Sequence, residues 1–150
     1  MEGADIEVVV KPIDSFTLTA NLGLLDAQID SSEYPHHQLP LSPQVTLSKI
    51  TDHKLLLAGG TLDMQLSANF KSHQFFDVIN NPILSQNSYW LENAHVGYSF
   101  DDDQWEVAAF ARNLSGQEYY IDVFDLSFVG FYQGIMGQPR TYGAEVNYRF

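Results

Sequence analysis

Side chains that could bind a metal or catalyse a reaction are few in this sequence, and their spacing does not favour a site. His36 and His37 are adjacent. Adjacent residues of an extended chain point to opposite faces, so two such imidazoles rarely share one ion. Asp101–Asp103 could suggest calcium, but an EF-hand's alternate ligands, central glycine and distal glutamate are missing, and a solvated turn fits better. Asn113-Leu114-Ser115 formally matches a glycosylation acceptor, and we interpret it as the end of a strand.

Composition removes further classes of function. No nucleophile, base and orienting group come together in the sequence, so we predict a protein that is not an enzyme and that holds no metal or cofactor. The absence of cysteine excludes disulfides, thiolate metal sites and cysteine nucleophiles. The formal net charge of −12, with only seven Lys and Arg residues, argues against nucleic acid as a partner.

The carboxyl-terminal residues, Thr141–Phe150, alternate strictly between polar and apolar side chains. An extended strand would therefore have one polar and one apolar face. In a water-soluble sheet the apolar face covers a core, whereas in an outer-membrane barrel it meets lipid and the polar face lines the lumen. The apolar set is Tyr142, Ala144, Val146, Tyr148 and Phe150, and the polar set is Thr141, Gly143, Glu145, Asn147 and Arg149.

The same alternation recurs along the chain, and only residues 45–50 alternate poorly. With the terminal strand it predicts about seven strands, most of them near the ~9–11 residues that a tilted strand needs to cross a bilayer. No run of 18 apolar residues exists, which excludes a helical span. The fold class is therefore predicted as all-β, an antiparallel up-and-down transmembrane β-barrel segment. The other alternating segments are residues 5–11, 16–24, 61–71, 93–100 and 105–112.

The predicted connections alternate between short and long. Up-and-down strands send alternate connections to opposite ends, and outer-membrane barrels have short periplasmic turns and long extracellular loops. If Phe150 ends at the periplasmic rim, all three long connections emerge outside. The breaks are predicted at Pro12–Asp14, Asp30–Gln44, His53–Gly60, Lys71–Asn87, Asp101–Gln104 and Ser115–Pro139.

Several motifs, in this order, resemble the carboxyl-terminal barrel region of TonB-dependent outer-membrane receptors. They are GADIEVVVKPIDSFTLTANLGLLDAQID, a strand pair around a proline turn; LPLSPQVTLS, where a loop re-enters the barrel; WEVAAFARNLSGQEYY, the late strand; and GQPRTYGAEVNYRF, the closing strand. The match spans nearly the whole chain, residues 1–150.

The resemblance implies a 22-stranded barrel filled by a separate amino-terminal plug, which imports a scarce, bulky ligand such as a ferric siderophore. About seven strands cannot close such a barrel, and neither a plug, a TonB-contacting segment nor an export signal is recognised in the sequence. We therefore expect the carboxyl-terminal part of a longer protein of a Gram-negative outer membrane. The implied partners are outer-membrane lipid and lipopolysaccharide, the barrel-assembly machinery, TonB through the missing amino-terminal region, and the ligand.

Two groups of residues are candidate sites under this interpretation. The aromatic and glycine-rich connection Ser115–Pro139 would contact the ligand, or its rings would pack between loops or at the membrane interface. The closing strand resembles the recognition signal of the barrel-assembly machinery. The candidate ligand-contact residues are Tyr119, Tyr120, Phe124, Phe128, Phe131 and Tyr132; the candidate signal residues are Thr141, Gly143, Val146, Tyr148 and Phe150.

The charged residues of the polar faces would form a hydrogen-bonding network inside the barrel or contact the plug. They are Glu7, Asp63, Glu106, Arg112, Glu145 and Arg149. A second hypothesis is a complete small β-barrel or a soluble β-sandwich that binds a lipophilic ligand, and a third is a decayed gene without function.

Overall fold

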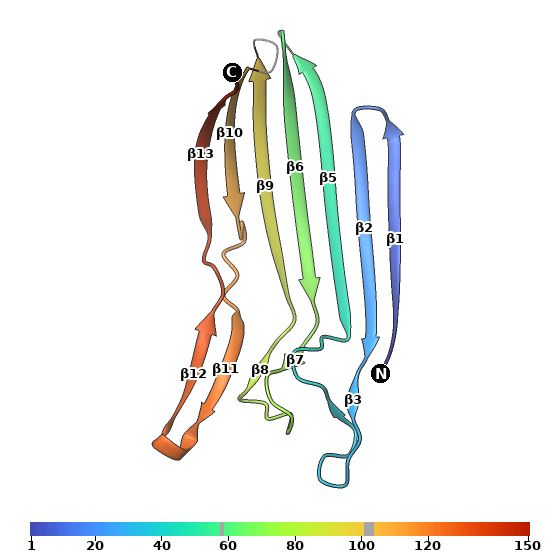
Figure 1. Cartoon of the computed structure of the whole chain (residues 1–150), viewed down its shortest axis with the longest axis vertical. Coiled ribbons are helices and arrows are strands. Elements are labelled where there is room, and N and C mark those ends of the chain that lie inside the picture. The colour runs from blue at the N-terminus through green and yellow to red at the C-terminus, as the bar shows by residue number, and fades with distance from the viewer. Residues whose placement is uncertain (58, 101–103) are drawn as a thin grey trace.

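A computed structural model of the chain describes residues 1–57, 59–100 and 104–150. Seven strands form one antiparallel sheet in the order β1-β2-β5-β6-β9-β10-β13, so that each pairs with the next long strand along the chain (Figure 1). The strands are β1 (Glu2–Ile13), β2 (Phe16–Asp26), β5 (Val45–Leu57), β6 (Gly60–Lys71), β9 (Tyr89–Phe100), β10 (Trp105–Arg112) and β13 (Thr141–Tyr148).

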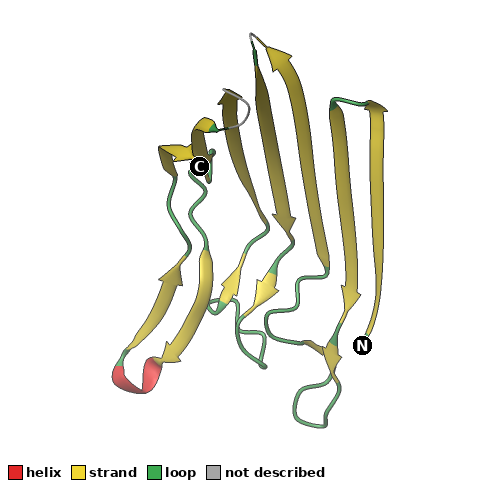
Figure 2. Cartoon of the chain, turned by 45° about the horizontal axis from the view of Figure 1, so that its top comes forward, coloured by secondary structure: helices red, strands yellow, loops and turns green. Residues whose placement is uncertain are grey.

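This architecture confirms the predicted all-β, up-and-down segment. The first two strands form the expected hairpin, with Val10 opposite Leu18 and Ile13 opposite Phe16. The sheet is not closed, because β1 and β13 are its two edges and do not pair with each other. The seven strands form a single open layer (Figure 2), and not the closed small barrel or the two-layered sandwich of the second hypothesis.

The predicted break at His53–Gly60 is too long, because β5 continues to Leu57 and β6 begins at Gly60. The polar residues that suggested a turn have partners across the sheet. Asp52 accepts a hydrogen bond from the Gln65 side chain at 2.7 Å, and Lys54 pairs with Asp63 at 3.3 Å. His53 lies opposite Phe16 and Met64 on the apolar face, with its ring 5.7 Å from that of Phe16.

The sheet has one apolar and one polar face, and its apolar face is exposed. Cross-strand register places Leu66 in a row with Ala94, Ala111 and Tyr142, all four on the apolar face. Leu66 is 57% exposed and Tyr142 is 81% exposed. An exposed apolar surface of this extent indicates that another phase or another molecule covers it.

Aromatic rows bound this apolar face at both ends. At the end with the short turns, Trp105 lies 4.6 Å from Tyr148, and Tyr148 lies 5.0 Å from Phe150. At the other end the rings of Phe70 and Trp90 are 5.1 Å apart. Ten residues of β9 separate Trp90 from the opposite row, which is about 33 Å along the strand and about 25 Å once a barrel tilt of ~40° is applied.

All three long connections lie at one end of the sheet, opposite the carboxyl terminus (Figure 1). This confirms their predicted placement on one side. Much of their length is regular, however, and forms three small hairpins. Their elements are β3 (Gln28–Ile29), β4 (His37–Gln38), β7 (Gln74–Phe75), β8 (Ser85–Gln86), β11 (Tyr120–Leu126), the 3-10 turn η1 (Ser127–Val129) and β12 (Phe131–Met136).

Burial is concentrated at this end of the molecule. Among the described residues, Ala108 is the one buried apolar or polar side chain that lies well within the sheet. The first two connections are tied by Asn80, whose amide exchanges two hydrogen bonds, of 2.7 and 2.8 Å, with the backbone of Gln38. The other buried side chains are Ala27, Ser42, Gln74, Leu84, Gln86, Tyr89 and Asn113.

Within the described residues, no helix has the length and apolar character that a helical membrane span requires.

Candidate functional site

The third long connection, which the sequence predicted only as a break between strands, forms a β-hairpin. β11 pairs with β12 from Tyr120 opposite Met136 to Leu126 opposite Phe131, and η1 closes the tip. Asp125 accepts a hydrogen bond from the Ser127 backbone at 2.8 Å. Hydrogen bonds from the Ser127 side chain and backbone lower the pKa of this carboxyl below its ordinary value.

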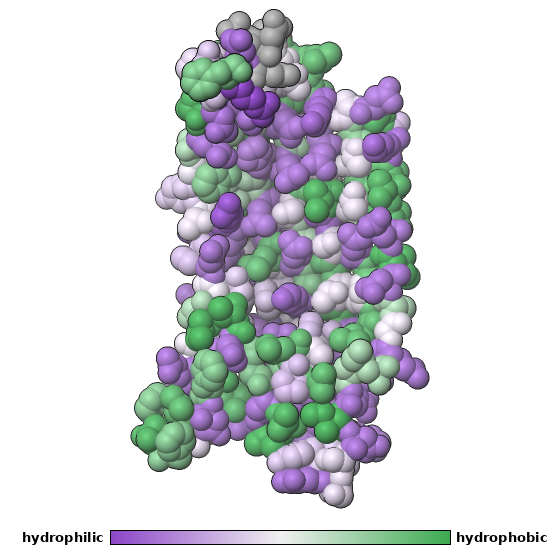
Figure 3. Space-filling view, in the orientation of Figure 1, coloured by the Kyte–Doolittle hydropathy of each residue, from purple (hydrophilic) through white to green (hydrophobic). Residues whose placement is uncertain are grey.

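Five of the six candidate ligand-contact residues occupy three different places on this hairpin, and the sixth, Tyr119, precedes β11. Phe124 and Phe131 lie on one face, and Tyr120 and Tyr132 lie on the other, because cross-strand partners share a face and neighbours alternate. Phe128, at the tip, is 82% exposed. These rings therefore do not form a single patch, and hydrophobic residues gather at the tip of the hairpin (lower left in Figure 3).

Tyr119 and Tyr120 attach the hairpin to the neighbouring connection. The Tyr119 ring stacks on Tyr89 at 4.8 Å, and the Tyr120 backbone N–H donates to the Gln86 side-chain oxygen at 2.7 Å. Both rings lie over glycines of the returning leg, Gly137 and Gly134, where any Cβ would overlap them. Tyr119 packs between loops, which is the alternative role considered for these aromatic residues.

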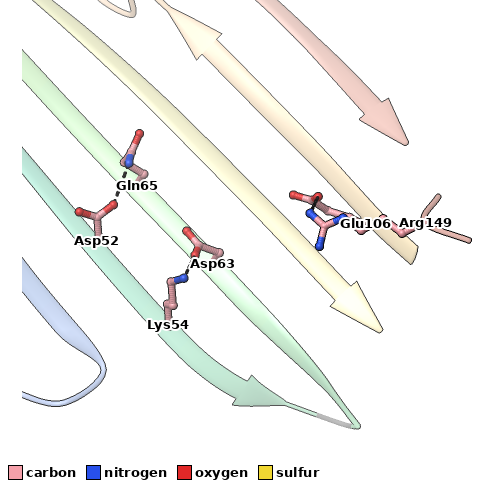
Figure 4. A network of polar contacts seen from close by, with 6 residues as sticks. All are labelled: Asp52, Lys54, Asp63, Gln65, Glu106 and Arg149. Atoms are coloured by element: carbon pink, nitrogen blue, oxygen red, sulfur yellow. Dashed lines mark hydrogen bonds and ion pairs between the residues drawn. The ribbon is translucent and has the colours of Figure 1, made fainter. Parts of the chain in front are cut away.

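The polar face of the sheet carries a network of charged side chains. Asp63 pairs with Lys54, and Glu106 lies 3.8 Å from Arg149 (Figure 4). Glu145 lies 3.9 Å from His95 on the same face. Exposed ion pairs of this kind each contribute about 0–1 kcal/mol to the free energy of folding. Their main effect is therefore to place charged groups on this face of the sheet.

Two open hollows lie within this network, and hydrophilic residues dominate the same face in Figure 3. One, of about 520 Å³, has a floor that includes His95, Phe110 and Glu145. The other, of about 680 Å³, includes Asp63, Glu106 and Arg149. Arg112 lies 5.2 Å from the Phe110 ring. Of the predicted polar-face residues Glu7 stands apart, because it pairs with Asn21 near the β1 edge.

The candidate assembly-signal residues lie on β13 and just beyond it. Thr141 and Gly143 are on the polar face, where the Phe110 ring covers Gly143 and would approach a Cβ there to 2.8 Å. Val146, Tyr148 and Phe150 are on the apolar face, and Phe150 is fully exposed. One edge of β13 is unpaired in the described sheet, since β10 is its one neighbour.

The histidine pair and the formal glycosylation motif singled out from the sequence do not form functional sites among the described residues. The Nδ1 of His37 lies 3.0 Å from the carbonyl oxygen of Val78, and His36 has a positive φ of 56°. In the parts of the chain that the structure describes, no three His, Cys, Asp or Glu residues gather as a metal site would require. The Asp101–Asp103 turn lies outside the described residues. Asn113 is buried with its amide fully engaged, so the formal glycosylation match has no accessible acceptor.

Sequence reasoning missed two residues that organise the loop end, Gln86 and Tyr89. Gln86 lies within the predicted break Lys71–Asn87, and Tyr89 lies between that break and the next predicted strand. Nothing in the local pattern distinguishes either residue from solvated loop residues. A buried glutamine whose oxygen caps a strand in another connection needs the tertiary fold to be recognised.

Comparison with solved structures shows the same fold in siderophore receptors. No protein-family profile matches the sequence. The chain superposes on the ferric yersiniabactin uptake receptor FyuA from Yersinia pestis with a TM-score of 0.86 at 17% identity, covering 96% of this chain and 22% of that one. The chain superposes on BauA, the ferric preacinetobactin receptor from Acinetobacter baumannii, with a TM-score of 0.75 at 23% identity, covering 96% of this chain and 21% of that one. It superposes on the ferric-catecholate import receptor Fiu from Escherichia coli K12 with a TM-score of 0.73 at 15% identity, covering 99% of this chain and 20% of that one.

These matches confirm, at the level of the fold, the resemblance drawn from the sequence motifs. The chain spans about a fifth of the length of the receptors it matches. All three of those proteins are described as receptors.

Proposed function

We propose that this chain is the carboxyl-terminal wall of an outer-membrane β-barrel receptor, which imports a scarce, bulky ligand such as a ferric siderophore by TonB-dependent transport. The observation that carries the proposal is the single-layered sheet with an exposed apolar face between two aromatic rows. The spacing of these rows, about 25 Å after tilt, matches the lipid-facing band of outer-membrane barrels. The fold shared with three siderophore receptors supports the same assignment.

The direction of the edge strands supports a longer parent protein. β1 and β13 run the same way, because seven strands alternate in direction from one edge to the other. Antiparallel closure therefore needs an odd number of further strands, and a 22-stranded barrel would supply fifteen. In the parent protein the plug and the TonB-contacting segment precede this chain, the polar face meets the lumen, and lipid and lipopolysaccharide surround the apolar face.

The hairpin tip provides a test of ligand recognition in the full-length receptor. Replacing Phe128 and Phe131 together with Ser should lower uptake of the recognised ferric siderophore by at least about tenfold, because two aromatic anchors of more than ~1 kcal/mol each together exceed the ~1.4 kcal/mol of a tenfold change. Uptake of iron-55 by iron-starved cells, offered a panel of ferric siderophores, measures this effect at matched receptor abundance.

Leu56→Ser serves as the matched control, because Leu56 is 88% exposed and lies at the end of β5 opposite the hairpin. It should leave uptake unchanged. Equal uptake by the Phe128/Phe131 double variant and the wild type would remove the hairpin tip from the ligand site. Failure of the receptor to import any ferric siderophore would contradict the proposed function itself.

A further inference from the structure

Asn113 occupies the junction between the sheet and the β11–β12 hairpin. It follows the last residue of β10, has a positive φ of 52°, and is 4% exposed. Asparagine tolerates this left-handed conformation better than most residues with a side chain. The chain leaves the wall of the sheet at this residue.

The Asn113 amide joins the two legs of the hairpin. Its Nδ2 donates to the carbonyl oxygen of Gln117 at 2.9 Å and to that of Gln138 at 3.0 Å, and its Oδ1 accepts from the Gln117 backbone N–H at 2.8 Å. Gln117 precedes β11, and Gln138 follows β12. Both amide hydrogens are therefore used to hold the outgoing and returning legs at one point.

The same residue is fastened to the wall of the sheet. The Asn113 backbone N–H donates to the Asn93 side-chain oxygen at 3.1 Å, and the Asn93 amide donates to Ser67 at 3.1 Å. These bonds connect the base of the hairpin to β9 and then to β6. Beside them, Ser115 donates to the Glu92 carboxylate at 2.7 Å.

We propose that Asn113 is the positioning residue of the hairpin, a clamp that fixes the hairpin's direction relative to the sheet. The buried amide replaces the strand pairing that stops at Arg112 and resumes at Tyr120, so that the hairpin continues the wall as one body. In assigning the hairpin to ligand contact this inference rests on the proposed function, but the placement of the hairpin needs no ligand.

Spin labels on the full-length receptor in detergent test the clamp. The 150 residues contain no cysteine, so Val129→Cys in η1 and Lys49→Cys in β5 add two defined label sites, both on exposed residues. The pulsed-EPR distance distribution between the two labels should be a single narrow peak when Asn113 is unchanged. Asn113→Gly, which keeps the positive φ but removes the amide, should change that peak into a broad or multiple distribution, with the receptor's melting temperature nearly unchanged.

Two further variants complete the test. Asn113→Asp keeps an acceptor for the Gln117 N–H but loses both donors, so it should broaden the distribution as well. Asn80→Gly removes another asparagine with positive φ, 54°, whose amide clamps Gln38 in a different connection, and it should leave the peak narrow. An unchanged narrow peak in Asn113→Gly and Asn113→Asp would overturn the clamp. Because no ligand is present, this outcome is independent of the uptake measurement.

Discussion

Replacing Tyr148 and Phe150 together with Ser should lower the amount of assembled full-length receptor by about tenfold without lowering its synthesis. The Tyr148 ring lies between Trp105 and Phe150 on the apolar face, and β13 offers an unpaired edge. A strand edge can dock by backbone hydrogen bonds while spaced side chains fill apolar pockets. Ring contacts contribute ~0.5–1.5 kcal/mol each, and ~1.4 kcal/mol is a factor of ten in a docking equilibrium.

Pulse-labelled cells distinguish this assembly signal from a purely structural role. Asn147→Ser, at the residue before Tyr148 but on the polar face, is the control and should assemble at the normal rate. If the double variant reaches the outer membrane with normal kinetics and only melts at a lower temperature, the rings are interfacial anchors and the signal hypothesis fails.

A charge in the middle of the apolar face should have an effect at least as large. Leu66 lies four residues from both Leu62 and Phe70 along β6, near the middle of the band between the aromatic rows. Leu66→Arg should therefore lower the free energy of unfolding in lipid vesicles by ~2–4 kcal/mol, the cost of arginine at the bilayer midplane on a lipid-facing barrel position.

Gln65→Arg is the matched control, because Gln65 is the exposed neighbour on the opposite face and bonds Asp52. An arginine there can pair with that carboxylate, and the change should stay within ~1 kcal/mol. Equal losses for the two variants in equilibrium unfolding would contradict the assignment of faces.

The sequence predicted the long strands well where one face of the strand is uniformly apolar and the other is uniformly polar. In β6, apolar and polar side chains alternate without exception from Leu62 to Phe70, so the period of two is visible without the partner strands. β5 was predicted poorly because Lys49 and His53 lie on its apolar face and Ile50 and Leu56 lie on its polar face. Those exceptions depend on the opposite residues, such as Phe16 beside His53, which a single strand does not reveal.

The candidate site was predicted only in outline. The aromatic content of Ser115–Pro139 identified the segment, but not the hairpin that separates Phe124 and Phe131 from Tyr120 and Tyr132. Asn113 was noticed for a formal motif and interpreted as a strand end, which is its position. Its role as a clamp depends on Gln138, far along the chain, and no local pattern contains that contact.

The central claim, that the apolar face meets lipid and the polar face does not, has one direct measurement. Full-length receptor in vesicles would carry a single environment-sensitive fluorophore at Leu66→Cys or Gln65→Cys, and nitroxide-bearing lipids would serve as quenchers. Adjacent residues of a strand point to opposite sides, so we expect strong quenching at position 66 and little at position 65. Strong quenching at 65, or no lipid quenching at 66, would contradict it.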